Sequence, residues 1–377
     1  MMTALIPRTH YASLADCVYL NQASLGLLGQ PATEAMHRFV DDVARHGNWN
    51  MSDADEVGFF SQLRERAARL FRADADRIAI LSSASELLGQ IPLLIPPIAG
   101  HKILAVATDF PAVTRPWLRL AAGGDCQVQF VEDNPASDLT ADLIAALDQH
   151  TALIAVSCVQ YATGTQLDVP RLRSAANQAG ARLVIDATQA AGALPMDATA
   201  WDADVVVSSG YKWLGGHGGV ALAVMAPSLL ERMPPLPGWM GAPDPFDFDA
   251  TQVLVADDAR RYTQSTMSYV SIAALTASLD QLLSLGEAPI ETHARRLSAM
   301  LIERASKNGW QPFRDPSDRA ASPHIVSLGR PGQESEATLE ALRTANIVCS
   351  SRGGRVRVSL APYNDESDID ALVAALG

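Results

Sequence analysis

Lys212 is the side chain of this sequence best suited to act as an amine nucleophile. The chain has only three lysines, and the other two, Lys102 and Lys307, lie in segments typical of charges exposed to water. Lys212 instead lies in the segment SGYKWLGG (209–216), among small and aromatic residues. Poor hydration of an ammonium lowers its pKa, which favours nucleophilic chemistry. Taken alone, a lysine that forms an ion pair or extends to water is the more common alternative.

An acid and a serine-rich segment follow apolar runs in the same way as Lys212 does. Asp186 comes directly after the run 183–185, and the segment SSAS (82–85) comes after the run 78–81. If these runs are parallel strands of one sheet, their carboxyl ends share the edge where such sheets bind ligands. Asp186 is then either a partner for a cationic ligand atom or a helix N-cap, and the serines form either an anion site or an ordinary cap.

Short apolar runs alternate with helix-like segments from about residue 75, which is typical of a parallel α/β sheet covered by helices. The expected strands are 78–81, 103–107, 128–131, 153–157, 183–185, 205–208 and 220–225, with helices such as 139–149 and 170–179 between them. After a Pro/Gly-rich loop at 234–245, we expect helices 271–285, 290–307, 336–345 and 366–376 and strands 325–328, 347–350 and 356–360. The pattern therefore predicts a large α/β domain over 16–260 and a small α+β domain over 261–377, which the segment 1–15 joins.

Composition and charge argue against several classes of function. A net charge of −13 disfavours non-specific electrostatic binding to nucleic acid or to an anionic membrane. The four cysteines form no CxxC pair and the histidines form no HExxH motif, so neither a disulfide framework nor a metal site is predicted. The chain shows no P-loop, no signal-like start and no apolar stretch long enough for a bilayer, so we expect a soluble, cytoplasmic protein.

The segments around Asp186 and Lys212 resemble the signature of class V aminotransferases, which are fold-type I pyridoxal-phosphate enzymes. These segments read VIDATQAAGALPMD (184–197) and DADVVVSSGYKWLGGHGGVA (202–221). In the family's pattern, a strand followed by Asp-x-x-Gln precedes Ser-x-His/Tyr-Lys by about two dozen residues. The Tyr-Lys-Trp-Leu version is nearest the isopenicillin-N-epimerase, selenocysteine-lyase and kynureninase branch. The resemblance extends from the YLN segment (19–21) to the RVS segment (357–359).

This resemblance implies how the chain would hold pyridoxal 5′-phosphate. Lys212 would carry the cofactor as a Schiff base and later move the Cα proton, and Asp186 would keep the pyridine nitrogen protonated. Gln189 would bind the 3′ oxygen, although a Gln in a first helical turn is more often exposed. Phe110 would stack on the ring, although a phenylalanine at a strand end is more often part of the core. The phosphate would be bound by Ala84, Ser85, Ser209 and Tyr211.

The resemblance also implies the substrate site and the assembly. Arg357 would bind the α-carboxylate of an amino-acid substrate, and Asn21 and Tyr161 would line the same pocket. By periodicity alone, Arg355 and Arg357 share one face of a strand, and an edge strand with two solvated arginines is the alternative. Thr266 would reach the phosphate of the neighbouring subunit, which implies a homodimer with a shared active site; read alone, it is the start of a helix.

Three departures from the family's pattern leave the reaction open. Tyr161 stands where many relatives carry Asn, and His217 lies in an altered glycine-rich run. Cys349 lies in a predicted strand, where its thiol has little freedom to move toward a substrate. The expected function is a pyridoxal-phosphate enzyme that acts on an α-amino acid through a lysine-linked aldimine and a Cα carbanion. Epimerase or lyase chemistry is weakly favoured over amino transfer. The alternatives are a cysteine desulfurase or C–S lyase and, in another class, a catalytically silent binding or regulatory protein of the same fold.

Overall fold

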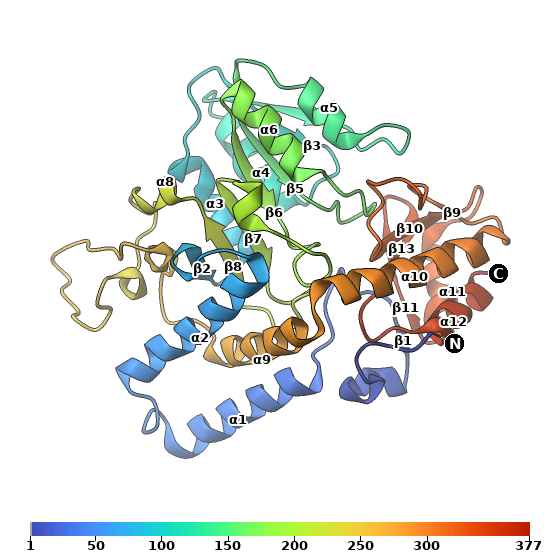
Figure 1. Cartoon of the computed structure of the whole chain (residues 1–377), viewed down its shortest axis with the longest axis horizontal. Coiled ribbons are helices and arrows are strands. Elements are labelled where there is room, and N and C mark those ends of the chain that lie inside the picture. Colours follow the sequence, from blue (N-terminus) through green and yellow to red (C-terminus); the bar gives the residue numbers. More distant parts are fainter. Residues whose placement is uncertain (1) are drawn as a thin grey trace.

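The computed structural model describes residues 2–377 of the chain. Its larger part is built on a seven-stranded sheet with the strand order β2-β8-β7-β6-β5-β3-β4 (Figure 1). Only β8 runs against the other strands, because it pairs antiparallel with both β2 and β7. The strands are β2 (Ile78–Leu81), β3 (Lys102–Val106), β4 (Gln127–Val131), β5 (Thr151–Ser157), β6 (Arg182–Asp186), β7 (Val205–Ser209) and β8 (Ala221–Met225).

Apolar side chains are buried on both faces of this sheet. In β6, Leu183 and Ile185 belong to one hydrophobic cluster, whereas Val184 between them belongs to the cluster on the opposite face. Successive side chains of a strand point to opposite faces, so a strand covered on both sides is apolar throughout. The helices of this part are α1 (Gln30–His46), α2 (Asp53–Phe71), α3 (Ala84–Leu94), α4 (Pro111–Ala121), α5 (Leu139–Ala145), α6 (Val169–Ala179), α7 (Ala198–Trp201), α8 (Pro227–Leu230) and α9 (Tyr269–Leu285), and α1 packs on α9 rather than on the sheet.

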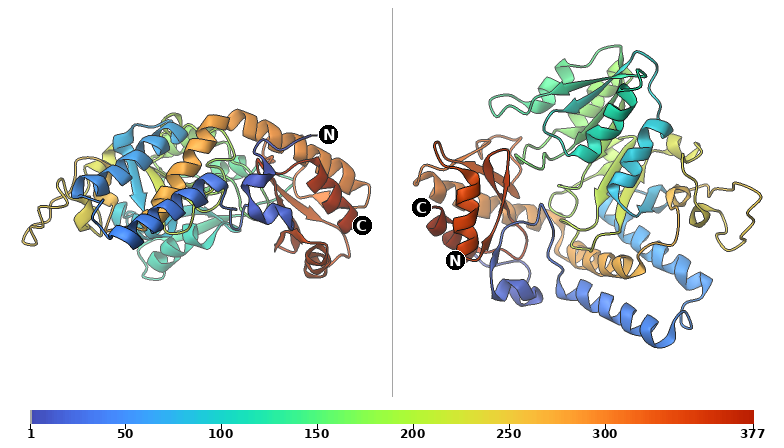
Figure 2. Two further views of the ribbon diagram at one scale, coloured as in Figure 1. Left: turned by 90° about the horizontal axis from the view of Figure 1, so that it is seen from below. Right: turned by 180° about the vertical axis from the view of Figure 1, so that it is seen from behind.

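The smaller part contains a four-stranded antiparallel sheet with the order β12-β13-β10-β9. Both described chain ends lie in this part, and α9 and α10 lead into it from the large sheet (Figures 1 and 2). A short parallel pair, β1 with β11, ties the N-terminal segment to it. The elements are β1 (Val18–Tyr19), β9 (Gln311–Pro312), β10 (Ile325–Gly329), β11 (Ile347–Val348), β12 (Ser350–Arg352), β13 (Arg355–Ser359), α10 (Glu287–Ser306), α11 (Ser335–Thr344) and α12 (Glu366–Leu376).

The expected fold class is confirmed, and the structure departs from the sequence-based elements in three places. The helix expected over 139–149 ends at Ala145, where Lys102 Nζ donates to the Ala146 carbonyl and to Asp148 and fixes the turn into β5. The strand expected over 347–350 is split, because β11 pairs with β1 whereas β12 pairs with β13. Helices α1 and α2 were not predicted. The domain division near residue 260 stays a prediction.

Two general properties bear on function. Within residues 2–377, none of the helices combines the length and the apolar character that crossing a bilayer requires. In the same part of the chain, no group of three or more His, Cys, Asp or Glu side chains is arranged to hold a metal ion.

Candidate active site

A cavity lies at the carboxyl ends of β5, β6 and β7. Parallel strands place their carboxyl ends on one edge of the sheet, and the polar residues that follow them meet there. Three residues of its lining were not predicted from the sequence, namely Ala112, Ser157 and Thr188. The predicted site residues that line it are Ala84, Ser85, Phe110, Tyr161, Asp186, Gln189, Ser209, Tyr211 and Lys212.

Lys212 is buried in this cavity, with 7% of its surface exposed. Its Nζ lies 5.2 Å from the centre of the Phe110 ring and 5.7 Å from the centre of the Tyr211 ring. Burial lowers the pKa of Lys212 to about 8, while the charge of Asp186 acts in the opposite direction. The amine therefore exchanges a proton close to neutral pH, as a nucleophile or a general base must.

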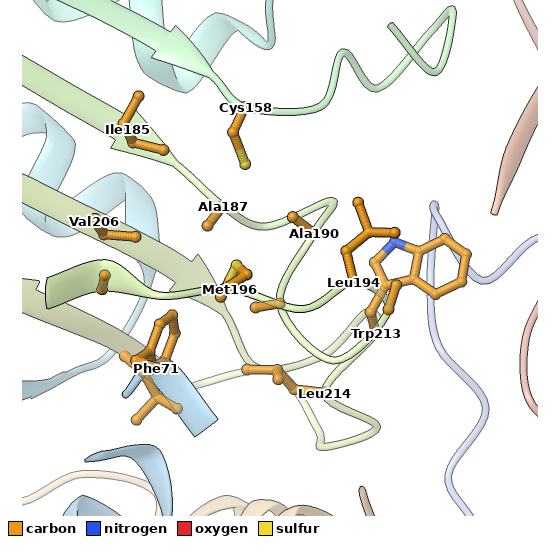
Figure 3. Packing of buried hydrophobic residues seen from close by; sticks show 14 of the residues in the cluster. Phe71, Cys158, Ile185, Ala187, Ala190, Leu194, Met196, Val206, Trp213 and Leu214 are labelled. Carbon is orange, nitrogen blue, oxygen red and sulfur yellow. The ribbon is translucent and has the colours of Figure 1, made fainter. Parts of the chain in front are cut away.

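The backbone around Lys212 is held by close packing. Gly210 donates to the Val220 carbonyl at 3.0 Å, and a Cβ at Gly210 would lie 2.8 Å from that oxygen, so only glycine fits. Figure 3 shows Trp213 beside Leu194, and Trp213 and Leu214, which follow the lysine, both belong to the hydrophobic core. The lysine is thus presented by a rigid loop, which is what a catalytic side chain needs.

Gln22, which sequence reasoning missed, connects the N-terminal segment to this loop. Its Nε2 donates to the Lys212 carbonyl at 2.8 Å, and its Oε1 accepts from Tyr363 Oη at 2.8 Å and from the Leu27 amide at 3.2 Å. A Cβ at Gly26 would lie 2.3 Å from the Lys212 carbonyl oxygen, so the two segments touch backbone to backbone. No local sequence signal marks Gln22, because two of its three partners, Lys212 and Tyr363, are distant in the chain.

Asp186 is a buried carboxyl at the end of β6. Its Oδ1 accepts from the Thr188 amide at 2.8 Å, so it caps a turn, and the alternative of a helix N-cap is wrong because no helix begins there. Burial raises its pKa, although Thr188 and the charge of Lys212 oppose this. A buried carboxyl of this kind is stabilised by a proton or a cationic partner.

The start of α3 leaves two backbone donors free at the other end of the cavity. The N-cap hydroxyl of Ser83 accepts from the Glu86 amide at 3.1 Å, whereas the amides of Ala84 and Ser85 have no acceptor among residues 2–377. Both residues line the cavity together with Ser209 and Tyr211. Free N–H groups at a helix N-terminus form a favourable site for a phosphate.

Phe110 lies beside a buried acid that sequence reasoning also missed. The Phe110 amide donates to Asp109 at 2.7 Å, and the amide of Ser157 donates to the same carboxylate at 2.7 Å. Burial raises the pKa of Asp109 to about 6. The Phe110 ring, which is partly exposed, meets the Tyr161 ring edge-on at 5.5 Å between centres. Its position after β3, directly next to an aromatic residue, was the available signal for Asp109.

Arg357 brings the predicted substrate residues together. It is 1% exposed on β13, and it donates to the Tyr161 carbonyl at 2.8 Å, to Asn21 Oδ1 at 3.3 Å and to the Ser24 hydroxyl. β13 lies between β12 and β10, so the alternative of an edge strand with solvated arginines is wrong. Arg355 does not reach this site, because it donates to backbone carbonyls near β9 and β10.

Gln189 lines the cavity, whereas Thr266 does not. Gln189 is buried, which excludes the exposed alternative, and its side chain accepts from Trp213 Nε1 at 2.7 Å and donates to the Ala23 carbonyl at 3.0 Å. Its own carbonyl accepts from Nε2 of the buried His324 at 2.5 Å. Thr266 is exposed and does not line the cavity of its own chain. Its contact with a neighbouring subunit stays a prediction.

Neither cysteine near the site has the surroundings of a reactive thiol. Cys349 lies between β11 and β12, and burial raises the pKa of its thiol to about 12. Cys158 packs in the core, and burial raises its pKa as well. Reactive cysteines need an accessible thiolate, so the positions of these two thiols disfavour thiolate chemistry.

These side chains suit pyridoxal phosphate. The free amides of α3 match its phosphate, the buried carboxyl of Asp186 matches its protonated ring nitrogen, and the Phe110 ring offers a stacking surface beside the Lys212 amine. Residues 18–372 match the family model described as aminotransferase class-V. The chain belongs to this family. This member of the class V aminotransferase family is therefore an enzyme that depends on pyridoxal 5′-phosphate, as its signature predicts.

Relatives of this class V enzyme cover almost its whole length. An uncharacterized aminotransferase YcbU from Bacillus subtilis is 25% identical over 363 residues, which are 96% of this chain and 94% of the relative. A kynureninase from Shouchella clausii is 27% identical over 372 residues, 94% of this chain and 86% of the relative. Among solved structures, the fold is similar to that of the cystine C-S lyase C-DES, with a TM-score of 0.88 and 22% identity over 97% of this chain and 98% of the other. It is also similar to the cysteine desulfurase CsdA from Escherichia coli, with a TM-score of 0.84 and 22% identity over 98% and 96% of the two chains.

Proposed function

We propose that this enzyme removes the Cα proton of an α-amino acid and carries out a lyase-type reaction on it. The observation that carries the proposal is the buried Lys212 amine, whose pKa is lowered to about 8 and which shares its cavity with Asp186. The names of its relatives, which include kynureninases and a C-S lyase, favour a lyase over an aminotransferase. Epimerisation, which uses the same lysine and acid, is the second candidate.

Pyridoxal phosphate, when bound, supplies an electron sink that stabilises negative charge on the substrate Cα. Asp186 would then hold a proton on the pyridine nitrogen. Burial raises the pKa of this carboxyl and so disfavours a lone carboxylate, whereas a cationic ring nitrogen beside it would stabilise the charged form. Phe110 would pack against the ring, and Gln189 holds the turn that carries Asp186 close to Trp213. The residues that would hold the phosphate are Ala84, Ser85, Ser209 and Tyr211.

Lys212 and Arg357 act on the substrate itself in this proposal. Arg357 binds the α-carboxylate, and its contacts with Asn21, Ser24 and the Tyr161 carbonyl fix the plane of its guanidinium. Lys212, held by its rigid loop, accepts the Cα proton and returns it to product. Both tasks depend on exclusion of water, and both side chains are buried.

Persulfide transfer is a weaker candidate, although a desulfurase is among the similar folds. That chemistry requires a thiolate that can move to the substrate. Cys349 is held between two strands and its thiol has a pKa raised to about 12 by burial, so neither requirement is met. A C–S lyase needs no such thiol and remains within the proposal.

Product analysis with a panel of L-amino acids tests the proposal. A lyase releases part of the substrate side chain and leaves the cofactor unchanged after each turnover. An aminotransferase would instead produce a keto acid and leave the amino group on the cofactor until a second substrate arrives. An epimerase would yield the D-amino acid with mass unchanged. Keto acid formed in amounts equal to cofactor, with no side-chain product, would contradict the lyase reading.

The second part of the proposal is a homodimer with a shared active site. Residues 236–254, here called the arm, extend away from the body of the chain (Figures 1 and 2). The arm exposes Phe248, Val253 and Leu254, each more than half accessible. Exposed apolar groups of this kind favour burial against another surface, and the exposed Thr266 near its base would then face the partner's cofactor. Light scattering should give the mass of a dimer, and Phe248→Glu should shift it toward the monomer.

A further inference from the structure

Arg352 is a second arginine at the substrate site that neither the sequence nor the family signature identified. It ends β12 and is half-buried, and a tight turn through Gly353 and Gly354 leads from it into β13, which carries Arg357. Both glycines have positive φ, of 55° and 71°, which other residues rarely adopt. The turn therefore fixes how the two arginine-bearing strands face each other.

The two arginines share one hydroxyl. Arg352 Nη2 donates to Ser24 Oγ at 3.4 Å, and Arg357 Nη2 donates to the same oxygen. Arg352 Nη1 donates to the Ser351 carbonyl at 2.6 Å. These two contacts use two of the five N–H donors of a guanidinium, so the others are available to a ligand.

No carboxylate of the chain neutralises this pair. Among residues 2–377, the hydrogen-bond acceptors of Arg352 and Arg357 are hydroxyl, amide and backbone oxygens, and none belongs to Asp or Glu. The Nε of Arg357 is buried and has no partner in the same part of the chain. The chain as a whole is acidic, with 42 carboxylates against 29 Lys and Arg, so two adjacent uncompensated guanidinium groups require an explanation.

The positive charges of Arg352 and Arg357 both act on the catalytic lysine. Arg357 and Arg352 each lower the pKa of Lys212, and Arg352 lowers the pKa of Arg357 as well. Asp186 is the acid that raises the pKa of Lys212 against them, and its own proposed partner is the ring nitrogen of the cofactor. An α-carboxylate supplies one negative charge and fits the fork of one arginine. A substrate with a single carboxylate would therefore leave one guanidinium without a counter-charge.

We propose that Arg352 binds an anionic group on the substrate side chain, so that the substrates are α-amino acids whose side chain ends in a carboxylate, sulfinate or sulfonate. This inference rests on the proposed function and names the substrate class of the same site. Arg357 binds the α-carboxylate, and Arg352, on the neighbouring strand, binds the acidic group of the side chain. Ser24 keeps the two guanidinium groups side by side.

Binding of matched amino acids to the cofactor-loaded protein tests the inference. L-aspartate, L-glutamate and L-cysteate are compared with L-asparagine, L-glutamine and L-alanine by titration of the visible absorption band. The wild type should bind the acids at least about 10-fold more tightly than their amides, and Arg352→Gln should weaken acid binding by about 10- to 100-fold while alanine changes little. Arg352→Lys, which keeps the charge, should retain part of the preference. Arg355→Gln is the matched control, because Arg355 lies on the same hairpin outside the site.

Two results would overturn the inference. Equal affinity of the wild type for acids and amides would show that the site does not recognise an acidic side chain. Equal weakening of aspartate and alanine binding by Arg352→Gln would show that both arginines bind the α-carboxylate. Calorimetry with succinate and the cofactor-free protein gives an independent readout, in which Arg352→Gln should reduce affinity and Arg355→Gln should not. If no amino acid changes the absorption band, the proposed function fails, and the calorimetric comparison still decides whether Arg352 binds an acid.

Discussion

The pH dependence of cofactor attachment tests the environment of Lys212 directly. Only the neutral amine can attack the cofactor aldehyde, so the attachment rate should follow the fraction of neutral Lys212. With a pKa of about 8, this fraction is about 10% at pH 7 and about 90% at pH 9. The rate should therefore rise about tenfold between these values and then level off. An ordinary lysine, with a pKa near 10.4, would show a rise of about 100-fold over the same range and no plateau.

Two variants should shift the midpoint of the profile of attachment rate against pH in opposite directions. Asp186 raises the pKa of Lys212, so Asp186→Asn should move the plateau to lower pH. Arg357 lowers the same pKa, so Arg357→Gln should move it to higher pH. A general loss of stability would not produce shifts in both directions.

Rapid mixing of cofactor-free protein with pyridoxal phosphate provides the assay, with growth of the visible band as the signal. The rate of a small model amine, measured at each pH, removes the contribution of the cofactor's own ionisation. Lys212→Ala should give no band. A wild-type rate that keeps rising tenfold per pH unit up to pH 10 would refute the claim that burial lowers the pKa of this lysine.

Three further predictions concern stability. Gln22→Ala should lower the free energy of unfolding by about 3 kcal/mol in urea titrations, because three buried hydrogen bonds of about 1 kcal/mol each are lost, whereas Gln30→Ala on the surface should change it little. Burial lowers the pKa of His324 from 6.5 to about 4, so the neutral imidazole contributes fully to the free energy of unfolding above pH 6.5, and this contribution falls by about 3 kcal/mol as the pH drops toward 4. His324→Gln should flatten the profile of unfolding free energy against pH in that range, measured by denaturant titration. An unchanged slope would contradict this prediction. Asp133→Ala removes the buried carboxylate that contacts Arg314 at 2.9 Å and leaves only the more exposed Asp318 at 3.1 Å, so it should cost about 3 kcal/mol in the same titrations. A loss below about 1 kcal/mol would show that the pair is not desolvated.

The sheet and the residues at its edge could be predicted because their signals are local. β6 is buried on both faces, so it reads as a continuous apolar run, and Asp186 follows at the point where the strand ends. Lys212 stands out by its rarity and its small and aromatic neighbours. Helix α2 also has a local signal, the capping box that joins Ser52 and Asp55 at its start.

Contacts between distant segments could not be predicted in this way. Ser24 and Arg352 are 328 positions apart, and they meet only because β1 pairs with β11 beside the small sheet. Alternation along β13 indicated only that Arg355 and Arg357 share a face of the strand. Arg355 donates to backbone carbonyls elsewhere, whereas Arg352, on the neighbouring strand, meets Arg357 at the Ser24 hydroxyl. The split of the expected strand at Cys349 has the same origin, since its two halves pair with different strands.

The most direct test of the account is to locate the lysine that carries the cofactor. Borohydride reduction of the loaded protein fixes the cofactor on its lysine, and peptide mass spectrometry then finds the modified residue. We expect a single pyridoxyl group on Lys212, with loss of the visible band and no label in Lys212→Ala. A label on Lys102 or Lys307, or no label in wild-type protein that has been supplied with pyridoxal phosphate, would contradict the central claim.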